Sequence, residues 1–166
     1  RAKNGTIENV TANSSVGYSI ALDLNSSYNT ITNSKGISFS SYGIYLFSSN
    51  NNTFTNITGT SFSSYGIYLN INSSYNTFTN ATGNSSTSYG IYLNSAPNNT
   101  FINSNGTSTS THGIYFLSSS NNTIINSKGT TLAAGTHGIY LNTAPNSTLI
   151  NATGISPTTG SGIYII

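Results

Sequence analysis

The tripeptide Gly-Ile-Tyr occurs six times along this chain at nearly constant spacing. Its copies begin at Gly43, Gly66, Gly90, Gly113, Gly138 and Gly162, at intervals of 23, 24, 23, 25 and 24 residues. A Thr followed by a large apolar residue keeps the same period, at Thr6, Thr30, Thr53, Thr77, Thr100, Thr123 and Thr148. Self-similarity at 20–50 residues is typical of solenoids, propellers and arrays. The chain is therefore built from about seven copies of one unit.

Within each unit, the side chains follow the period of β-strands. In Ile44-Tyr45-Leu46 the apolar residues alternate with a Tyr, which predicts two inward side chains and one outward side chain. The segment led by Thr predicts a second short strand, and a Ser/Thr-rich stretch such as residues 107–111 predicts a third. Glycines fall between these segments, where we expect corners that need a permissive backbone: Gly36, Gly59, Gly83, Gly106, Gly129 and Gly154.

Three short strands per unit predict an all-β fold, a single-stranded parallel β-helix of about seven coils of 23–25 residues. We expect residues 1–166 to form one such domain. Inward side chains should form ladders along its axis, one of Ile44 and its equivalents, one of Leu46 and one of Ile31. A propeller is excluded because each blade needs four strands and about 40 residues.

Composition narrows the classes of partner. The chain has 30 Ser, 25 Thr and 26 Asn, but only 4 Lys and Arg and 2 Asp and Glu. Nucleic acid is an unsuitable partner because its binding depends on several basic residues that contact phosphates. The sequence also contains no apolar run of about 18 residues, so we expect no membrane span.

The repeat pattern resembles a known family. Asn98-Asn99-Thr100-Phe101 together with Gly90-Ile91-Tyr92-Leu93 is similar to the right-handed parallel β-helix repeats of the NosD-like family. That superfamily carries a carbohydrate-binding and sugar-hydrolase label, and its arrays are common in large surface proteins of archaea and some bacteria. The resemblance covers almost the whole chain and implies the fold. It implies no activity, because the matching residues are those that form the coils.

The residues that could support catalysis or metal binding are few. Glycoside hydrolysis needs two carboxylates at a set separation, and the only acids are Glu8 and Asp23 in the first, least regular unit. We therefore expect no enzymatic activity, no catalytic residue and no cofactor. His112 and His137 occupy equivalent places in adjacent units, where two imidazoles could bind a transition metal. The same place holds Tyr42, Tyr65 and Tyr89 elsewhere, so a substitute for Tyr is the simpler interpretation.

Two further columns of equivalent residues stand out. One is an outward Tyr ladder, which we expect to be exposed and able to stack on sugars or a partner: Tyr45, Tyr68, Tyr92, Tyr115, Tyr140 and Tyr164. The other is an Asn ladder, whose amides we expect to bond along the axis: Asn9, Asn33, Asn56, Asn80, Asn103, Asn126 and Asn151. Stacking between neighbouring units explains both columns, and saccharide binding is an additional role for the Tyr face alone.

Asn-x-Ser/Thr sequons number fourteen, against about nine expected by chance. Those outside the structural Asn ladder that we predict as glycosylation sites are Asn51, Asn98, Asn121, Asn146, Asn4, Asn25, Asn72, Asn84 and Asn105. The first four lie at one corner, two residues before the repeated Thr. Glycans would add solubility to a surface with few charges.

Neither end of the sequence reads as a polar cap. The usual step from the repeated Gly to the next repeated Thr is 10 residues. Counting from Gly162 to the C-terminus and then from Arg1 to Thr6 of a second copy gives the same step, so copies placed head to tail would continue in register. We therefore expect an extracellular or cell-surface structural protein, either a segment of a longer array or a filament subunit stacked head to tail and bearing N-glycans. The alternative is a carbohydrate-binding or adhesive module that uses the Tyr ladder on a surface polysaccharide. Ice binding needs a flat Thr-x-Thr array, which Phe39 and Phe62 interrupt beside Ser38 and Ser61.

Overall fold

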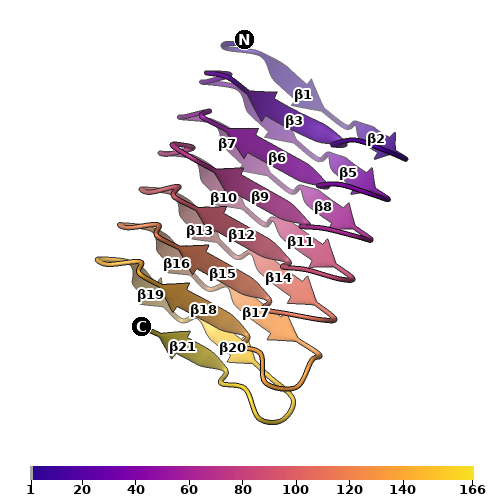
Figure 1. Cartoon of the computed structure of the whole chain (residues 1–166). Helices are drawn as coiled ribbons and strands as arrows, with labels where there is room; N and C mark the ends of the chain where they lie inside the picture. The colour runs from indigo at the N-terminus through magenta and orange to yellow at the C-terminus, as the bar shows by residue number, and fades with distance from the viewer. Residues whose placement is uncertain (1) are drawn as a thin grey trace.

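The structure is a computed structural model that describes residues 2–166. It consists of seven coils stacked along one axis, from the N-terminal coil at the top of Figure 1 to the C-terminal coil at the bottom. Three strands per coil form three seven-stranded sheets, and every pairing between coils is parallel. The predicted parallel β-helix of about seven coils is confirmed.

Sheet 1 contains the strands that begin at the repeated Thr: β1 (Thr6–Glu8), β4 (Thr30–Thr32), β7 (Thr53–Thr55), β10 (Thr77–Thr79), β13 (Thr100–Ile102), β16 (Thr123–Ile125) and β19 (Thr148–Ile150). Sheet 2 contains β2 (Thr11–Ser14), β5 (Lys35–Ser38), β8 (Thr58–Ser61), β11 (Thr82–Ser85), β14 (Asn105–Ser108), β17 (Lys128–Thr131) and β20 (Thr153–Ile155). Sheet 3 contains the Ile-Tyr strands: β3 (Ile20–Asp23), β6 (Ile44–Phe47), β9 (Ile67–Asn70), β12 (Ile91–Asn94), β15 (Ile114–Leu117), β18 (Ile139–Asn142) and β21 (Ile163–Ile165).

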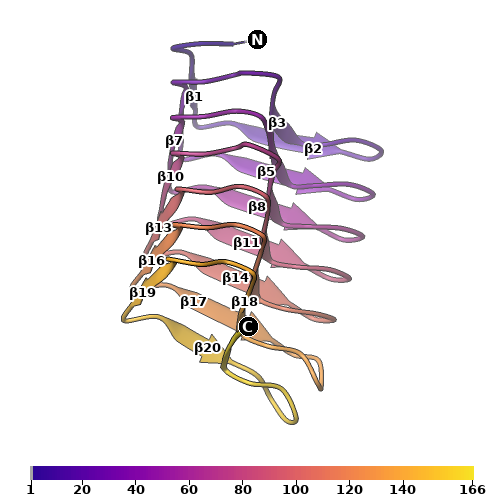
Figure 2. The ribbon, with the colours of Figure 1, turned by 60° about the vertical axis from the view of Figure 1, so that its left-hand side comes forward.

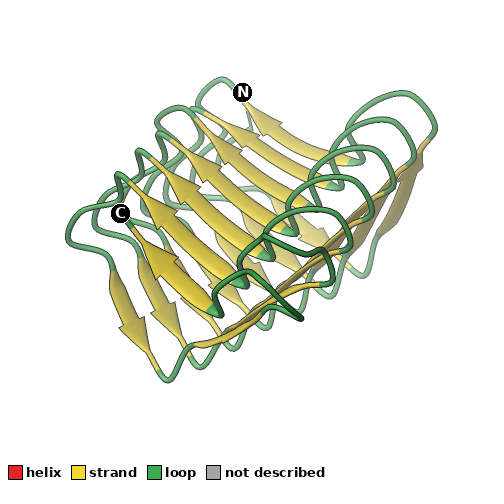
Figure 3. Cartoon of the chain, turned by 60° about the horizontal axis from the view of Figure 1, so that its bottom comes forward, coloured by secondary structure: helices red, strands yellow, loops and turns green. Residues whose placement is uncertain are grey.

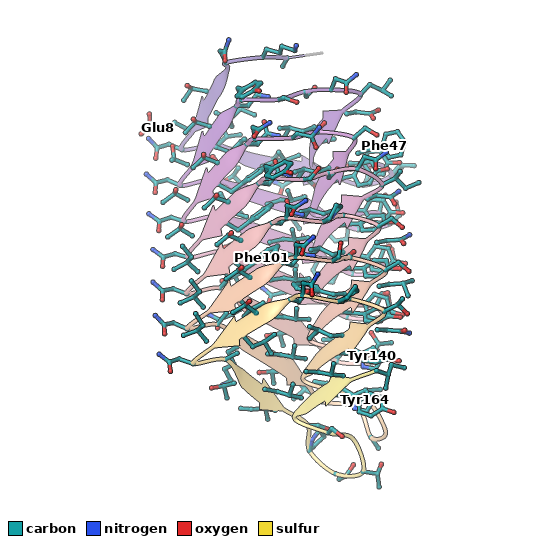
Figure 4. The ribbon with its side chains drawn as sticks, turned by 90° about the vertical axis from the view of Figure 1, so that its left-hand side faces the viewer. Glu8, Phe47, Phe101, Tyr140 and Tyr164 are labelled. Carbon is teal, nitrogen blue, oxygen red and sulfur yellow. The ribbon has the colours of Figure 1, made fainter. Side chains whose placement is uncertain are left out.

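The core is a set of apolar ladders enclosed by the three sheets. Phe54, Phe78 and Phe101 are stacked in sheet 1 with ring centroids 4.4 and 4.7 Å apart. Ile and Leu of sheet 3 face them and are fully buried in the middle coils. Figure 4 places Phe101 between the sheets and Glu8 on the outside. The predicted inward ladders are confirmed, although Ile163 and Ile165 in the last coil are exposed.

Two details of the predicted corners are wrong. Gly59 and Gly83 lie inside β8 and β11 rather than at corners, and neither has a positive φ. A Cβ at Gly83 would overlap the carbonyl group of Gly90, so glycine is required because sheets 2 and 3 approach closely there. The third strand is accordingly centred on the glycine, and Thr109–Thr111 lie in the loop that follows.

Left-handed residues other than glycine form the actual corners. Each of the seven sheet 1 strands is followed by an Asn with φ between 47° and 54°, from Asn9 to Asn151. A second left-handed position lies two residues before the repeated Thr, and a third follows most sheet 3 strands. Asn tolerates this conformation better than other residues with a side chain, which explains its abundance at corners.

The connection from sheet 2 to sheet 3 has five residues in each of the first five coils and seven in each of the last two. These loops project to one side of the stack in Figure 2, and Figure 3 shows them as a regular series. A buried hydroxyl fixes this loop in the second to fifth coils: in the second, Ser38 Oγ accepts the N–H of Ser41 at 2.9 Å and donates to the carbonyl of Gly17 at 2.8 Å. Within residues 2–166, no helix is long and apolar enough to cross a membrane.

Candidate functional site

The loops from sheet 2 to sheet 3 place a second aromatic column over the predicted Tyr ladder. The outer column consists of Tyr18, Tyr42, Tyr65, Tyr89, His112 and His137, with successive ring centroids 5.1–5.7 Å apart. The inner column is the ladder from Tyr45 to Tyr164, with centroids 4.8–5.5 Å apart. Rings of the two columns meet at steeper angles, as Tyr42 and Tyr68 do at 4.9 Å and 70°.

The prediction that the Tyr ladder is exposed is wrong for four of its six residues. Tyr45, Tyr68, Tyr92 and Tyr115 retain only 7–9% of their accessible surface. They point away from the Ile and Leu core, but the loop residue three positions earlier folds over each of them. Tyr140 is half-buried and Tyr164, in the last coil, is 39% exposed. Figure 4 shows Tyr140 and Tyr164 one below the other at that end. The ladder is thus a second apolar core and offers little open surface.

Burial also governs the ionisation of these phenols. Loss of solvent around the ring raises the pKa of Tyr68 to about 12, although a hydrogen bond from Asn94 opposes the shift. Burial, followed by the neighbouring phenols, raises the pKa of Tyr92 further. Both groups are therefore neutral at physiological pH, and neither supplies a base or a nucleophile.

The two histidines continue the outer aromatic column. Their rings are parallel within 3° at 5.1 Å, and His112 also stacks on Tyr89. Nδ1 of His112 accepts the backbone N–H of His137, and Nδ1 of His137 accepts that of Ser161. Burial and the adjacent His137 lower the pKa of His112 to about 4. The pair is neutral and already bonded at one nitrogen of each ring, which fits a replacement for Tyr.

No third metal ligand joins this pair: across the described residues, His, Cys, Asp and Glu nowhere gather in threes. Glu8 lies in β1 of sheet 1 and Asp23 in β3 of sheet 3, so the two carboxylates belong to different sheets. Replacement of Tyr, with no metal, stays the prediction for His112 and His137.

The predicted Asn ladder lies outside the coils. Asn33, Asn56 and Asn80 are exposed, and their amides bond in sequence at 3.0 and 2.9 Å. A further bond of 3.1 Å joins Asn151 to Asn126. Bonding along the axis is therefore confirmed for part of the ladder. The left-handed backbone, rather than the amide chain alone, explains why every coil has Asn there.

A second Asn ladder, which the sequence analysis missed, is buried. Its members directly precede the repeated Thr: Asn29, Asn52, Asn76, Asn99 and Asn122. Asn52 donates its backbone N–H and its Nδ2 to Oδ1 of Asn76, at 2.9 and 3.0 Å. Asn76 donates the same pair of hydrogen bonds to Oδ1 of Asn99. The signal in the sequence was the residue before Thr, which is Asn in five of seven units.

The predicted glycosylation corner is open to solvent. Asn51, Asn121 and Asn146 are exposed and Asn98 is half-buried, and all four have φ of 56–58°. Asn4, Asn25, Asn72 and Asn105 are exposed, whereas Asn84 in β11 is half-buried. Tyr28 and Tyr75 take the same left-handed corner in two other coils and are 58% and 62% exposed. These rings, rather than the Tyr ladder, are the exposed tyrosines of the middle coils.

Comparison with protein families agrees with this geometry. A family model described as a right-handed beta helix region matches residues 20–166. The chain belongs to the right-handed β-helix family. No curated protein and no solved structure matched it. The match covers the coils that form the three sheets and adds no site residue, and the narrower likeness to NosD-like repeats stays a prediction. In this right-handed β-helix, the distinctive surfaces are the covered aromatic columns, the Asn corners and the open ends.

Proposed function

We propose that this right-handed β-helix is a structural segment of an extracellular stalk, sheath or filament, in which coils stack end to end. The observation that carries the proposal is the regular stack, in which all three sheets run through the seven coils with their strands in parallel register. Within residues 2–166, β1, β2 and β3 pair on one side only, and so do β19, β20 and β21. Unpaired parallel edges favour the addition of further strands.

The two ends also have complementary profiles. At the N-terminal end the outer aromatic column finishes with the large Tyr18, and Ala21 stands in place of an inner Tyr. At the C-terminal end the inner column finishes with the large Tyr164 and Ser161 stands in the outer position. A stacked copy would set Tyr164 over Ala21 and Tyr18 over Ser161. Ile165, 63% exposed, would then be covered by the next coil.

Stacking of this chain on a second copy can be tested directly. Sedimentation velocity and electron microscopy of the full chain should show concentration-dependent rods with a repeat of about 4.8 Å along the axis. Ile165→Lys places a charge on the open end and should keep the protein monomeric. Thr107→Lys, on the outer face of sheet 2, is the matched control and should assemble normally. A monomer at all concentrations, with both variants folded, would refute self-stacking.

The extracellular location and the N-glycans belong to the same proposal. Its support is the column of exposed sequon residues at one corner, Asn51, Asn121 and Asn146, on a surface with few charges. Mass spectrometry of the native protein should find hexose-containing adducts on these three residues. Unmodified peptides at all three would remove glycosylation from the proposal and leave the stacking test unchanged.

Saccharide binding is the alternative function, and burial of the Tyr ladder weakens it. The rings open to a sugar in the middle coils are Tyr28 and Tyr75 at the sequon corner and the stacked pair Phe39 and Phe62. We propose no catalytic role for this chain, since its two carboxylates lie on different sheets.

A further inference from the structure

The outer face of sheet 1 presents a regular array of threonines. The first outward position of each strand is Thr in all seven coils, and strand pairing sets these residues directly over one another: Thr6, Thr30, Thr53, Thr77, Thr100, Thr123 and Thr148. The second outward position is Thr32, Thr55 and Thr79 in three consecutive coils and Ile in the next three. Coils two to four therefore carry a Thr-x-Thr array two ranks wide, in a place that the sequence analysis did not consider.

The hydroxyls of this array have no partner within the described residues. Buried hydroxyls behave differently, because Ser38, Ser104 and Ser127 each bond to backbone groups. Glu8 in the first coil is the only charged residue among the sheet 1 strands. From the second coil to the last, the face is therefore uncharged, and its Thr hydroxyls bind nothing within the described residues.

Strand propensity alone does not account for this uniformity. Thr is a good strand former and suits any outward position. The equivalent first position in sheet 2 varies, however, and includes Lys35, Asn105 and Lys128. Sheets 1 and 2 have the same number of strands and the same pairing, so the strand environment is matched. Five of the seven threonines complete an Asn-x-Thr sequon, but Thr30 and Thr77 do not, so neither folding nor glycosylation alone explains why sheet 1 keeps Thr in every coil.

The spacing of the array is close to that of ordered water. Adjacent strands place equivalent hydroxyls about 4.8 Å apart along the axis. Hydrogen-bonded oxygens about 2.75 Å apart in a tetrahedral network put water molecules two bonds away at about 4.5 Å. Threonines in register thus repeat at nearly the interval of one lattice row.

We propose that the outer face of sheet 1 binds ice. The Thr hydroxyls take the place of lattice water along a row, and the methyl groups order the water between them. Binding strength comes from many weak bonds made at once, so it depends on the length and flatness of the array. This site is distinct from the stacking ends. Asn51 and Asn98 lie two residues before Thr53 and Thr100, so glycans on them would project next to the array, and the ice-binding activity is proposed for the unglycosylated chain.

The test measures thermal hysteresis and inhibition of ice recrystallisation with the full chain. The wild type should show both activities and should give faceted crystals. Thr77→Lys, in the part that is two ranks wide, should reduce the hysteresis several-fold, and Thr53→Lys with Thr77→Lys should abolish it. Thr60→Lys on the outer face of sheet 2 is the control, since it adds the same charge to a matched strand and should leave the activity unchanged.

Circular dichroism establishes that each variant is folded before its activity is compared. Absence of hysteresis in the folded wild type would overturn the proposal. An equal loss of hysteresis in the sheet 1 and sheet 2 variants would also overturn it. Retention on crystalline cellulose without any activity on ice would also overturn it and would reassign the face to a solid polysaccharide. Ile165→Lys should bind ice as the wild-type monomer does, so a failure of end-to-end stacking and a failure of ice binding are separable.

Discussion

The backbone N–H of His137 donates a hydrogen bond of 2.9 Å to Nδ1 of His112 in the preceding coil. A nitrogen that accepts this bond carries no proton, so the folded state favours the neutral imidazole. The next coil repeats the arrangement, with the N–H of Ser161 donating to Nδ1 of His137 at 3.0 Å. Protonation of either ring would break a bond between coils and add charge to a stack of aromatic rings.

Acid should therefore destabilise the fold through these histidines. The pKa of His112 falls from its ordinary 6.5 to about 4 on folding because the ring is buried beside His137. A folded pKa below the unfolded one means that the stabilisation is complete above pH 6.5 and is lost as the pH falls towards 4. We expect the wild-type Tm to drop by a few degrees more over this interval than that of His112→Tyr. Equal slopes in thermal melts of the two proteins would contradict the prediction.

A glycine within a strand offers a second test. Gly83→Ala should cost about 3 kcal/mol, because its Cβ would overlap the carbonyl of Gly90 and the backbones of two sheets would have to separate. Thr82→Ala, the outward neighbour in β11, should change the free energy of unfolding by less than about 0.5 kcal/mol. Urea denaturation measures both. A mild effect at Gly83 would mean that the sheets can move apart there.

These glycines illustrate where prediction from sequence succeeded and where it did not. The period of the unit and the alternation in Ile44-Tyr45-Leu46 determine the strands, the parallel pairing and the inward ladders, since all three depend on repeated local patterns. A recurring glycine only signals that a side chain is not tolerated. Whether the reason is a left-handed corner or a close approach depends on the neighbouring sheet, which a local pattern does not specify.

The surfaces were harder to predict for the same reason. Alternation correctly directs Tyr68 away from the main core, but it does not describe the loop that brings Tyr65 over it. The buried Asn76 and the exposed Asn80 look alike in the sequence, because strand alternation ends at corners. The Thr face does not follow from the Ser/Thr stretch after the glycine, which is the more conspicuous signal in the sequence, because Ser61 and Ser85 of that stretch are buried.

The two Asn ladders should differ sharply in their contribution to stability. Asn76 is 1% exposed, and its Oδ1 accepts two bonds from Asn52. Asn76→Ala leaves the buried N–H of Asn52 without an acceptor and should cost about 3 kcal/mol. Asn80→Ala removes an exposed bond and places Ala in a left-handed conformation, which should cost about 1 kcal/mol. Urea midpoints at constant m-value distinguish these losses, and equal shifts would show that the buried ladder is replaceable by water.

The last prediction concerns the burial of the Tyr ladder. Tyr68 is 7% exposed and stacks on Tyr92 at 5.0 Å, whereas Tyr75 in the following corner is 62% exposed. Tyr68→Ala should lower the free energy of unfolding by about 3 kcal/mol, because it opens a cavity between the two aromatic columns. Tyr75→Ala should change it by less than about 0.5 kcal/mol.

The same pair of variants separates a structural from a binding role for tyrosine. If Tyr68 belongs to the core, Tyr68→Ala should lower the free energy of unfolding. Any retention of the protein on a polysaccharide column should instead be lost with Tyr75→Ala. Comparable stability of the two variants would mean that the loops leave the ladder open in solution. Tyr45, Tyr68 and Tyr92 would then return as a binding face, and the covered columns would be one of two states of the loops.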